Sequence, residues 1–395
     1  MSRVRQERGR ASQQSGSRRT GTTSTMRRRT QRDSSGSGFL VLMASVVVLN
    51  LVGLVMVLSA SSVTALYEYG SSFHFFLRQA VWVAAGFIAL AVATRVDYHQ
   101  WRRLAIPLVA VTAVLLVAVL VVGREVNGAQ RWLGTDYMSI QPSEFAKLAL
   151  ILFTADLLAR RADKMDRTAV TLRPVLIVLT LFAALVILQP NLGTMLLMAA
   201  IVFGMLFVAG TPFRSLGGLL GLASVGAVAL AMAAPYRRDR MLAVLDPWSD
   251  PLNTGYQTIQ SMVGIASGGL TGVGLGASRA KWGFLPFAHT DFIFAIIAEE
   301  LGLLGAGVVI LLFAALALIG LRAAIDAPDT FGRLLAAGIT TWLVVQAVIN
   351  IGSVVGVMPI TGVPLPFVSF GGSSLVVTMV ATGLLLNIAR HGRPR

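Results

Sequence analysis

The sequence contains no cysteine, which excludes disulfide bonds and thiolate metal sites from this protein. Charged side chains are also scarce, since they make up 13% of the 395 residues, against roughly 25% in an ordinary soluble domain. The four histidines are scattered along the chain and form no metal-binding cluster. The sequence therefore has neither the disulfide bonds of a small secreted domain nor the charged surface of a soluble enzyme.

Long apolar runs take the place of the missing charge. Hydrophobic residues make up 55% of the chain, and residues 39–59 contain no charged side chain. A run of about 20 apolar residues crosses the ~30 Å hydrocarbon layer of a membrane. We therefore expect an all-α polytopic membrane protein with about ten transmembrane helices, at residues 39–59, 75–93, 104–122, 143–159, 175–188, 192–209, 216–234, 292–319, 334–357 and 368–388. A large external loop is expected between the seventh and eighth helices.

The net charge of +15 is concentrated at the N-terminus. Residues 1–38 contain ten arginines against Glu7 and Asp33, and most of the others are Ser, Thr, Gln and Gly. Such a segment cannot bury a core, so we expect a disordered cytoplasmic tail. The prediction is contact with anionic membrane lipids and no binding of nucleic acid. The expected division is this tail, a transmembrane domain at 39–390, and a short cytoplasmic C-terminus at 391–395.

Lysine and arginine are distributed unevenly between the predicted connections. With the N-terminus inside, 24 of the 33 basic residues fall in cytoplasmic segments and eight in external ones. Cytoplasmic loops carry an excess of Lys and Arg. Both termini are therefore expected in the cytoplasm of a cell whose inner membrane the protein spans. The longest connection, 235–290, is expected outside.

Ionisable residues inside membrane spans are costly and frequently functional. Glu144 and Lys147 are three positions apart in the fourth predicted span, so they can pair on one helix face. Either the two residues form a structural ion pair, or Lys147 lies in a cavity and faces an anionic substrate. Glu299 and Glu300 lie in the eighth predicted span, where we expect them to pack against other spans.

Two further features precede that eighth span. Asp291 opens the helix, where it either caps free backbone amides or performs chemistry. A glycine-rich stretch at residues 268–276 could bring backbone amides close to a phosphate. It follows no strand and matches neither the dinucleotide-binding pattern nor a P-loop, so no nucleotide site is predicted.

Several motifs together resemble the SEDS family of membrane proteins (FtsW, RodA, SpoVE). Near the C-terminus, Asn350 is followed by a Gly- and Pro-rich signature that ends in Ser369, Phe370, Gly371, Gly372, Ser373 and Ser374. Four other groups occur in the family's order, at residues 127–132 with 141–147, at 189–194, at 245–247 with 255–257, and at 289–294 with 299–302. Together they cover nearly the whole membrane part of the chain.

The resemblance implies a peptidoglycan glycosyltransferase that polymerises lipid II. It implies that Asp291 is the catalytic residue. Positive charge should stabilise the departing pyrophosphate, either from basic side chains or from a divalent cation such as Mg or Mn, and both alternatives stay open. The implied partners are a class B penicillin-binding protein and other division proteins. Residues around positions 248–251 and 281–286 resemble the division branch of the family more than the elongation branch, so the division septum is expected. The implied substrate-binding residues are Arg131, Trp132, Glu144, Lys147, His289, Ser369, Gly371 and Gly372.

The chain departs from the family pattern at two positions. Phe287 stands where a polar residue is common, which puts in doubt a polar contact beside Asp291. Phe370 replaces a frequent tyrosine, a milder change. The buried charges also fit a transporter, specifically a lipid II flippase, and this alternative stays open beside the polymerase and the elongation-type enzyme.

Overall fold

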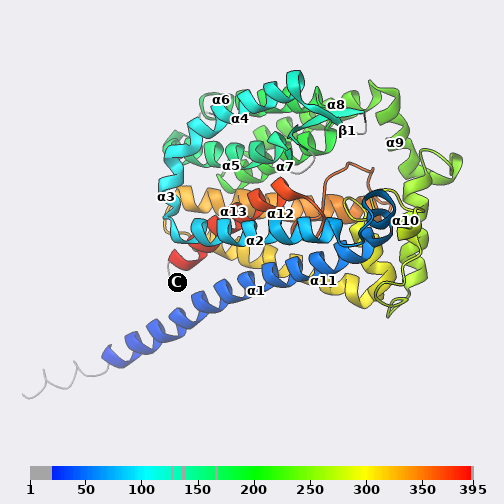
Figure 1. The fold of residues 1–395 in the computed structure, drawn as a ribbon. Coiled ribbons are helices and arrows are strands. Elements are labelled where there is room, and N and C mark those ends of the chain that lie inside the picture. The colour runs from blue at the N-terminus through cyan, green and yellow to red at the C-terminus, as the bar shows by residue number, and fades with distance from the viewer. Residues whose placement is uncertain (1–19, 127, 136–138, 165–167, 393–395) are drawn as a thin grey trace, which may run out of the picture.

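The computed structural model describes residues 20–126, 128–135, 139–164 and 168–392, and most of them form α-helices packed side by side (Figure 1). The long helices are α1 (Thr20–Tyr69), α2 (His74–Arg95), α4 (Ala105–Val122), α5 (Pro142–Arg160), α6 (Thr168–Ile187), α7 (Leu192–Val208), α8 (Phe213–Met232), α11 (Ile293–Ile325), α12 (Thr330–Val354) and α13 (Gly372–His391).

Each segment predicted to span the membrane coincides with one of these helices. Seven helical stretches in the described chain are long and apolar enough to cross a bilayer. The remaining three are the shorter apolar α6 and α7, and α5, which carries Glu144, Lys147 and Asp156. The all-α polytopic fold is confirmed, and the number of ten crossings stays a prediction.

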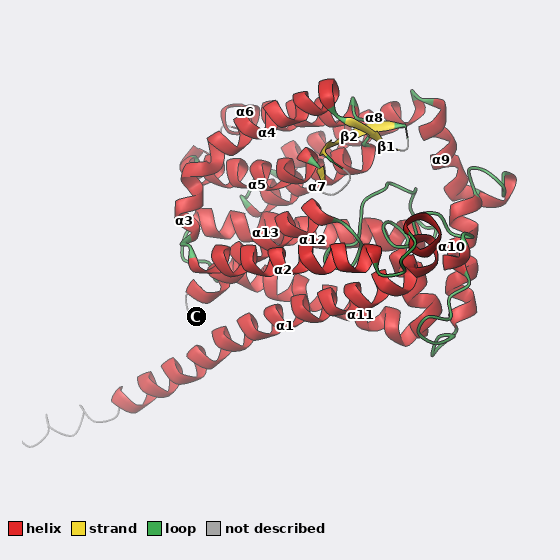
Figure 2. Ribbon diagram, viewed as in Figure 1, coloured by secondary structure: helices red, strands yellow, loops and turns green. Residues whose placement is uncertain are grey.

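The bundle has two distinct ends. The short helix α3 (Tyr98–Trp101) and the last turn of α13 lie at one end, on the side from which α1 enters (Figure 1). The opposite end carries α9 (Pro235–Leu245), α10 (Tyr256–Gly268) and most of the long loops (Figure 2). Both described ends of the chain therefore lie on one side, as an even number of crossings requires.

The loops at the second end contain small elements of their own. Three short strands, β1 (Arg124–Val126), β2 (Ala129–Gly134) and β3 (Ser139–Ile140), form an antiparallel sheet with the order β1-β2-β3 between α4 and α5. Short 3-10 turns at Pro247–Ser249 and Ala280–Trp282 interrupt the long connection between α8 and α11. This connection is thus a folded region.

The boundaries differ from the predicted ones at two places. The backbone is already helical from Thr20, inside the segment predicted to be disordered, because extending an existing helix is far easier than nucleating one. Residues 1–19 lie outside the described part. At the other terminus α13 begins at Gly372, four residues later than position 368, because the signature loop occupies the interval.

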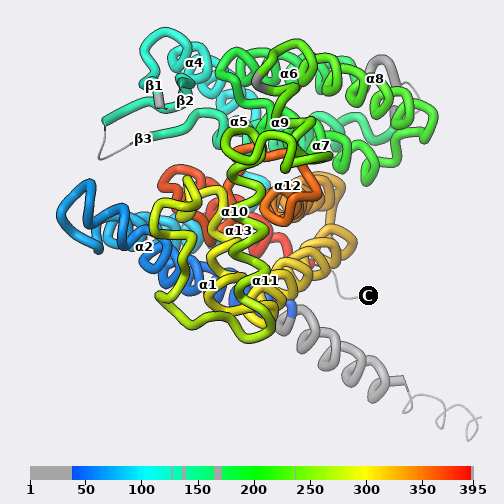
Figure 3. Tube along the Cα trace, turned by 90° about the vertical axis from the view of Figure 1, so that its right-hand side faces the viewer, coloured from blue at the N-terminus to red at the C-terminus, as the bar shows by residue number. Residues whose placement is uncertain are grey.

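The centre of the bundle is formed by α12 and α13. Their most apolar windows are 67% and 72% buried inside the protein, whereas that of α8 is 11% buried. The end-on view shows these two helices between a layer containing α4 to α8 and a layer containing α1, α2 and α11 (Figure 3). Side chains on α12 and α13 can therefore reach the loops from both layers.

The connection between α12 and α13 leaves helical geometry inside the protein. We call residues 355–371 the signature loop. Val363, Leu365, Phe367 and Val368 in this loop are all at most 3% exposed. Non-helical backbone at membrane depth is tolerated where protein surrounds it and satisfies its polar groups. Such a loop needs dedicated hydrogen-bond partners, and they come from α12, α2 and α9.

A topology test follows from the two-ended bundle, since the chain has no native cysteine to interfere. Ser249 and Ala162 are exposed and lie at opposite ends. We expect Ser249→Cys to react with a membrane-impermeant maleimide in intact spheroplasts. We expect Ala162→Cys to react only after permeabilisation. The reverse pattern would invert the predicted orientation.

Candidate active site

Asp291 lies at the end of the long connection between α8 and α11, two residues before α11. A tight turn precedes it, in which the amides of Thr290 and Phe292 donate to the carbonyl of Phe287 at 3.1 and 3.3 Å. Phe287 has φ 59° there, a left-handed conformation that is strained for a bulky side chain and that asparagine tolerates better. The unusual residue of this sequence therefore sits at a strained position next to Asp291.

The signature loop holds the backbone around Asp291. The Asn350 side-chain amide donates to the carbonyls of Asp291 (2.8 Å) and Val363 (2.9 Å), so one side chain fastens both segments. The Ser369 hydroxyl donates to the carbonyl of Thr290 at 2.6 Å. The backbone amide of Phe370 donates to the carbonyl of His289 at 3.0 Å. The backbone of three consecutive residues, 289–291, is thus bonded to α12 and its loop.

The carboxylate of Asp291 faces this loop. A Cβ atom built on Gly362 would lie 3.7 Å from Oδ2 of Asp291, and Gly362 adopts φ 70°. In the described part of the protein no hydrogen bond reaches the carboxylate oxygens of Asp291, although the neighbouring backbone is bonded. The side chain is therefore held in place through its backbone, with its oxygens left for another molecule.

The positive charges of two arginines, on different elements, oppose the effect of burial on the pKa of Asp291. Arg131 in β2 donates to the carbonyls of Gln189 (2.9 Å) and Pro190, between α6 and α7. Arg240 in α9 donates to the carbonyl of Ile360 at 3.4 Å. Burial raises the pKa of Asp291 to about 6, while the positive charges of Arg240 and Arg131 oppose the rise in this pKa. The carboxylate is therefore mostly ionised at neutral pH but close to titration.

His289 is placed beside aromatic rings. Its imidazole lies 4.6 Å from the ring of Phe75 and 5.8 Å from that of Phe370, measured between centroids. Burial lowers the pKa of His289 to about 4, so the ring is neutral at pH 7. His289 can pack against a substrate or donate one hydrogen bond to it, but it does not supply a positive charge.

Glu144 and Lys147 form a buried ion pair in α5. The Lys147 ammonium lies 2.8 Å from the Glu144 carboxylate and donates to Oε1 of Gln346 at 3.0 Å, and both charged residues are at most 2% exposed. The ammonium also lies 4.7 Å from the ring of Trp342. Gln346 in turn donates to the carbonyl of Pro364 in the signature loop at 2.8 Å. The pair thus supports this loop from inside the bundle.

The other predicted site residues have structural neighbours as well. Trp132 in β2 is partly buried beside Arg131. The amide of Gly371 donates to Gln79 at 3.3 Å. A Cβ on Gly372 would lie 2.4 Å from the Trp82 ring, so a side chain does not fit there. Their direct contact with a substrate stays a prediction.

The side chains near Asp291 limit how a metal ion could bind. No group of three or more His, Cys, Asp or Glu side chains that could hold a metal ion occurs in the described residues. Mg²⁺ is commonly held by one or two carboxylates together with substrate phosphates. Asp291 fits this arrangement as the single protein carboxylate, with the substrate phosphates as the other ligands.

A groove of about 780 Å³ lies elsewhere, between α6 and α8. It is lined by Leu172, Arg173, Leu176, Ile177, Thr180, Ser215, Gly218, Leu219 and Leu222. None of the predicted site residues contributes to it. Its lining has no group suited to acid–base chemistry, and its place on peripheral helices is typical of a surface that faces lipid.

The structure adds three residues to the site. The sequence identified Asn350 only as the start of the family signature, and it did not identify Gln346 or Arg240. Gln346 and Asn350 hold the signature loop, and Arg240 lies near Asp291. Arg240 had one signal in the sequence, a cluster of three arginines at 237–240 in a segment predicted to be external, where the positive-inside rule disfavours them. Gln346 is a polar residue in a predicted span, which indicates a role but not its partner.

The ion pair yields a stability prediction. Lys147→Met leaves the Glu144 carboxylate buried and unpaired, and breaking a buried pair costs about 3–5 kcal/mol. We expect a large drop in the melting temperature of the purified protein in detergent. Adding Glu144→Gln should restore much of the loss. A double variant as unstable as the single one would show that Lys147 is not there to neutralise Glu144.

Comparisons with known proteins agree with the motifs. Residues 40–394 match the family FTSW_RODA_SPOVE, described as "Cell cycle protein". A probable peptidoglycan glycosyltransferase FtsW of Geobacter metallireducens is 43% identical over 352 residues, which are 89% of this chain and 94% of the relative. Stage V sporulation protein E of Bacillus subtilis is 42% identical over 358 residues, which are 90% of this chain and 97% of the relative.

Solved structures show the same fold. One, described as "Structural coordination of polymerization and crosslinking by a peptidoglycan synthase complex", has a TM-score of 0.73 and 34% identity, and the match covers 89% of this chain and 97% of that chain. The rod shape determining protein RodA of Thermus thermophilus has a TM-score of 0.65 and 30% identity, with 89% and 96% covered. The chain belongs to the SEDS family of FtsW, RodA and SpoVE.

Proposed function

We propose that this protein is a peptidoglycan glycosyltransferase that polymerises lipid II into glycan strands at the outer face of the cytoplasmic membrane. The names of its relatives and the peptidoglycan synthase complex of similar fold support this activity. The observation that carries the proposal is the partly buried Asp291 carboxylate, held by its backbone at the end of the bundle that carries the external loops, with two arginines acting on it.

The reaction needs a proton acceptor. Lipid II is an undecaprenyl-pyrophosphoryl disaccharide-pentapeptide, and the 4-hydroxyl of the acceptor sugar attacks the anomeric carbon of the donor. The new C–O bond forms as the bond to the pyrophosphate oxygen breaks. A hydroxyl is a poor nucleophile, so a carboxylate within hydrogen-bond reach accepts its proton. Asp291, ionised at neutral pH but with a raised pKa, suits that task.

The leaving group needs positive charge rather than an acid. Undecaprenyl pyrophosphate departs as an anion, so the proton-donating second carboxylic acid of a hydrolytic glycosidase is unnecessary. Arg131 and Arg240 are the cations whose charges reach Asp291, and preorganised cations stabilise charge that develops in the transition state. A Mg²⁺ or Mn²⁺ ion held by Asp291 and the pyrophosphate would supply further positive charge.

The biological setting is part of the same proposal. Relatives named FtsW, at about 40% identity, and the resemblance to the division branch support a role in septal wall synthesis. A class B penicillin-binding protein would then cross-link the strands, with other division proteins nearby. The external connection around α9 and α10 offers the folded surface for such contacts. Both termini would lie in the cytoplasm.

Removing the base tests the activity. Asp291→Asn keeps the shape of the side chain but cannot accept the proton, so we expect a loss of roughly 10²–10⁴-fold in polymerisation. Burial of Asp291 disfavours its charged form, so the neutral amide should not lower the melting temperature at pH 7. The measurement is conversion of labelled lipid II by purified protein, with and without its transpeptidase partner.

Asp239→Asn is the matched control, since it also removes a carboxylate from the external connection. A folded Asp291→Asn variant with wild-type polymerisation would reject the proposed mechanism. Lipid II transport across vesicles without polymerisation by the wild type would favour the flippase alternative.

The pH profile tests the electrostatics. Because burial raises the pKa of Asp291 to about 6, kcat/KM should fall as the pH decreases below about 6, where the base becomes protonated. Arg240→Gln removes a charge that holds this pKa down, so it should move the acidic limb to higher pH. Arg238→Gln, at an exposed site on the same helix, serves as the control. An unchanged limb in Arg240→Gln would contradict the assignment.

A further inference from the structure

Helix α11 is broken close to its start. Gly302 has φ 67° and ψ −167°, so residues 293–301 form a short helix that is separate from 303–325. A break leaves backbone amides and carbonyls without their helical partners. Inside a membrane protein such groups are costly unless other protein groups bond to them. The short helix follows directly on Asp291, so whatever repairs the break also fixes that residue.

The glycine-rich stretch repairs it. The amides of Val273 and Gly274 donate to the carbonyls of Glu299 and Glu300 at 3.0 and 3.1 Å. In return the amides of the two residues after Gly302 donate to the carbonyls of residues 269 and 270 at 2.9 and 3.1 Å. These four backbone bonds insert the segment 268–276 into the broken helix.

Glycine is required for this close approach. A Cβ atom on Gly272 would lie 2.1 Å from the carbonyl oxygen of Glu300, and one on Gly268 would lie 2.0 Å from that of Ala298. Real side chains essentially never come so near to backbone. The motif that suggested phosphate binding in the sequence thus bonds to the protein's own helix.

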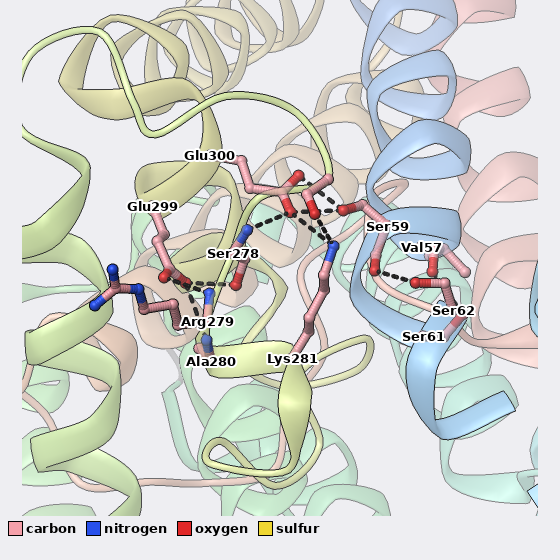
Figure 4. A network of polar contacts seen from close by, with 11 residues as sticks. Val57, Ser59, Ser61, Ser62, Ser278, Arg279, Ala280, Lys281, Glu299 and Glu300 are labelled. Atoms are coloured by element: carbon pink, nitrogen blue, oxygen red, sulfur yellow. Dashed lines mark hydrogen bonds and ion pairs between the residues drawn. The ribbon is translucent and has the colours of Figure 1, made fainter. Parts of the chain in front are cut away.

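The Glu299 side chain fastens the next part of the connection (Figure 4). Its carboxylate accepts from the Ser278 hydroxyl at 2.5 Å and from the backbone amides of Arg279 (2.8 Å) and Ala280 (3.4 Å). Both oxygens are engaged, since Oε1 accepts from Arg279 and Oε2 from the other two. Glu299 is 2% exposed, so water does not compete for these bonds.

The Glu300 side chain joins the same segment to α1. It accepts from the Ser59 hydroxyl at 2.6 and 2.8 Å and from the Ser278 amide at 3.2 Å. The Lys281 ammonium lies 3.6 Å from it and also donates to the carbonyl of Gly276 (Figure 4). The two adjacent glutamates therefore bind one short segment, 278–281, from two sides.

We propose that Glu299 and Glu300 are positioning residues for Asp291. Their bonds fix residues 278–281, the inserted glycine stretch fixes helix 293–301, and the stretch that carries Asp291 runs between these two anchors. Within it, the amide of Leu285 donates to the carbonyl of Ala280 at 2.9 Å, which ties the stretch to the first anchor. The inference rests on the proposed function, because it assigns a role in that reaction.

The rate of the proposed reaction depends on the position of the Asp291 carboxylate. Asp291 must place one carboxylate oxygen within hydrogen-bond reach of the acceptor hydroxyl. A displacement of 1 Å in a catalytic constellation can reduce the rate by about 10²-fold. Loosening either anchor lets the stretch 283–292 shift. The effect should appear in kcat more than in KM, since the arginines and the membrane-embedded lipid tail that bind the substrate are untouched.

The two glutamates give different predictions. In Glu299→Gln, one oxygen becomes an NH₂ group that faces N–H and O–H donors, so at least one buried bond is lost. In Glu300→Gln, the oxygen can keep the Ser278 amide while the NH₂ donates to the Ser59 hydroxyl. The buried Lys281 ammonium, however, loses the charge that it faces at 3.6 Å and keeps the carbonyl of Gly276. We therefore expect kcat to fall about tenfold or more in Glu299→Gln, and we expect Glu300→Gln to lower the melting temperature as well.

The experiment measures kcat and KM for lipid II together with hydrogen–deuterium exchange in the full-length protein. Exchange of the peptide that covers 278–292 should increase in Glu299→Gln, with KM unchanged within about twofold. Asp156→Asn is the control, a buried carboxylate at the opposite end that pairs with Arg102 and Arg160. It should lower the melting temperature and leave kcat and the exchange of this peptide unchanged.

Ser278→Ala is a milder second variant, for use if Glu299→Gln fails to fold. It removes one donor to Glu299 without leaving a new buried charge unpaired, and it should shift kcat and exchange in the same direction by smaller amounts. The proposal fails if Glu299→Gln exchanges like the wild type, or if its kcat falls no more than that of Asp156→Asn. A wild type without polymerase activity would refute the proposed function, whereas the exchange data would still test the anchors.

Discussion

The need to satisfy every backbone polar group at membrane depth shapes this protein. Helices satisfy it along their length, which is why ten long helices account for the bundle. Two described stretches of buried backbone leave helical geometry, the signature loop and the break in α11 at Gly302, which the largely exposed glycine stretch completes. Asp291 lies where the two meet. Asn350 bonds it to the first, and its own chain continues into the second.

Irregular backbone is thus concentrated around one carboxylate. The backbone of a residue within a regular helix is held by the hydrogen bonds of that helix. Here, the side chains of Asn350 and Ser369 and the backbone amide of Phe370 bond to the backbone of residues 289–291. The two glutamates bond to the segment before it. The carboxylate itself remains for the substrate. If Asp291 is the base, as proposed, such an arrangement fixes it without using its oxygens, as general-base catalysis requires.

Much of the bundle was predictable from the sequence because hydropathy reports directly on the membrane. All ten expected spans coincide with helices. Glu300 contacts another span, α1, as expected, whereas Glu299 bonds to loop residues 278–280. Asp291 could be singled out only through the family resemblance, since position alone allowed a simple helix cap. The start of α13 was misplaced because the buried signature loop is as apolar as a span.

What the sequence could not provide is which distant groups meet. Lys147 bonds to Gln346, 199 positions away, and nothing in either local sequence indicates that pairing. The glycine stretch was compatible with close approach to a phosphate, although it matched no nucleotide-binding motif, and the structure shows its amides on the carbonyls of Glu299 and Glu300 instead. The break at Gly302 was not predictable either, because the segment that completes it lies about 30 residues earlier in the chain. Local patterns thus determine the helices, and the contacts between their irregular connections determine the site.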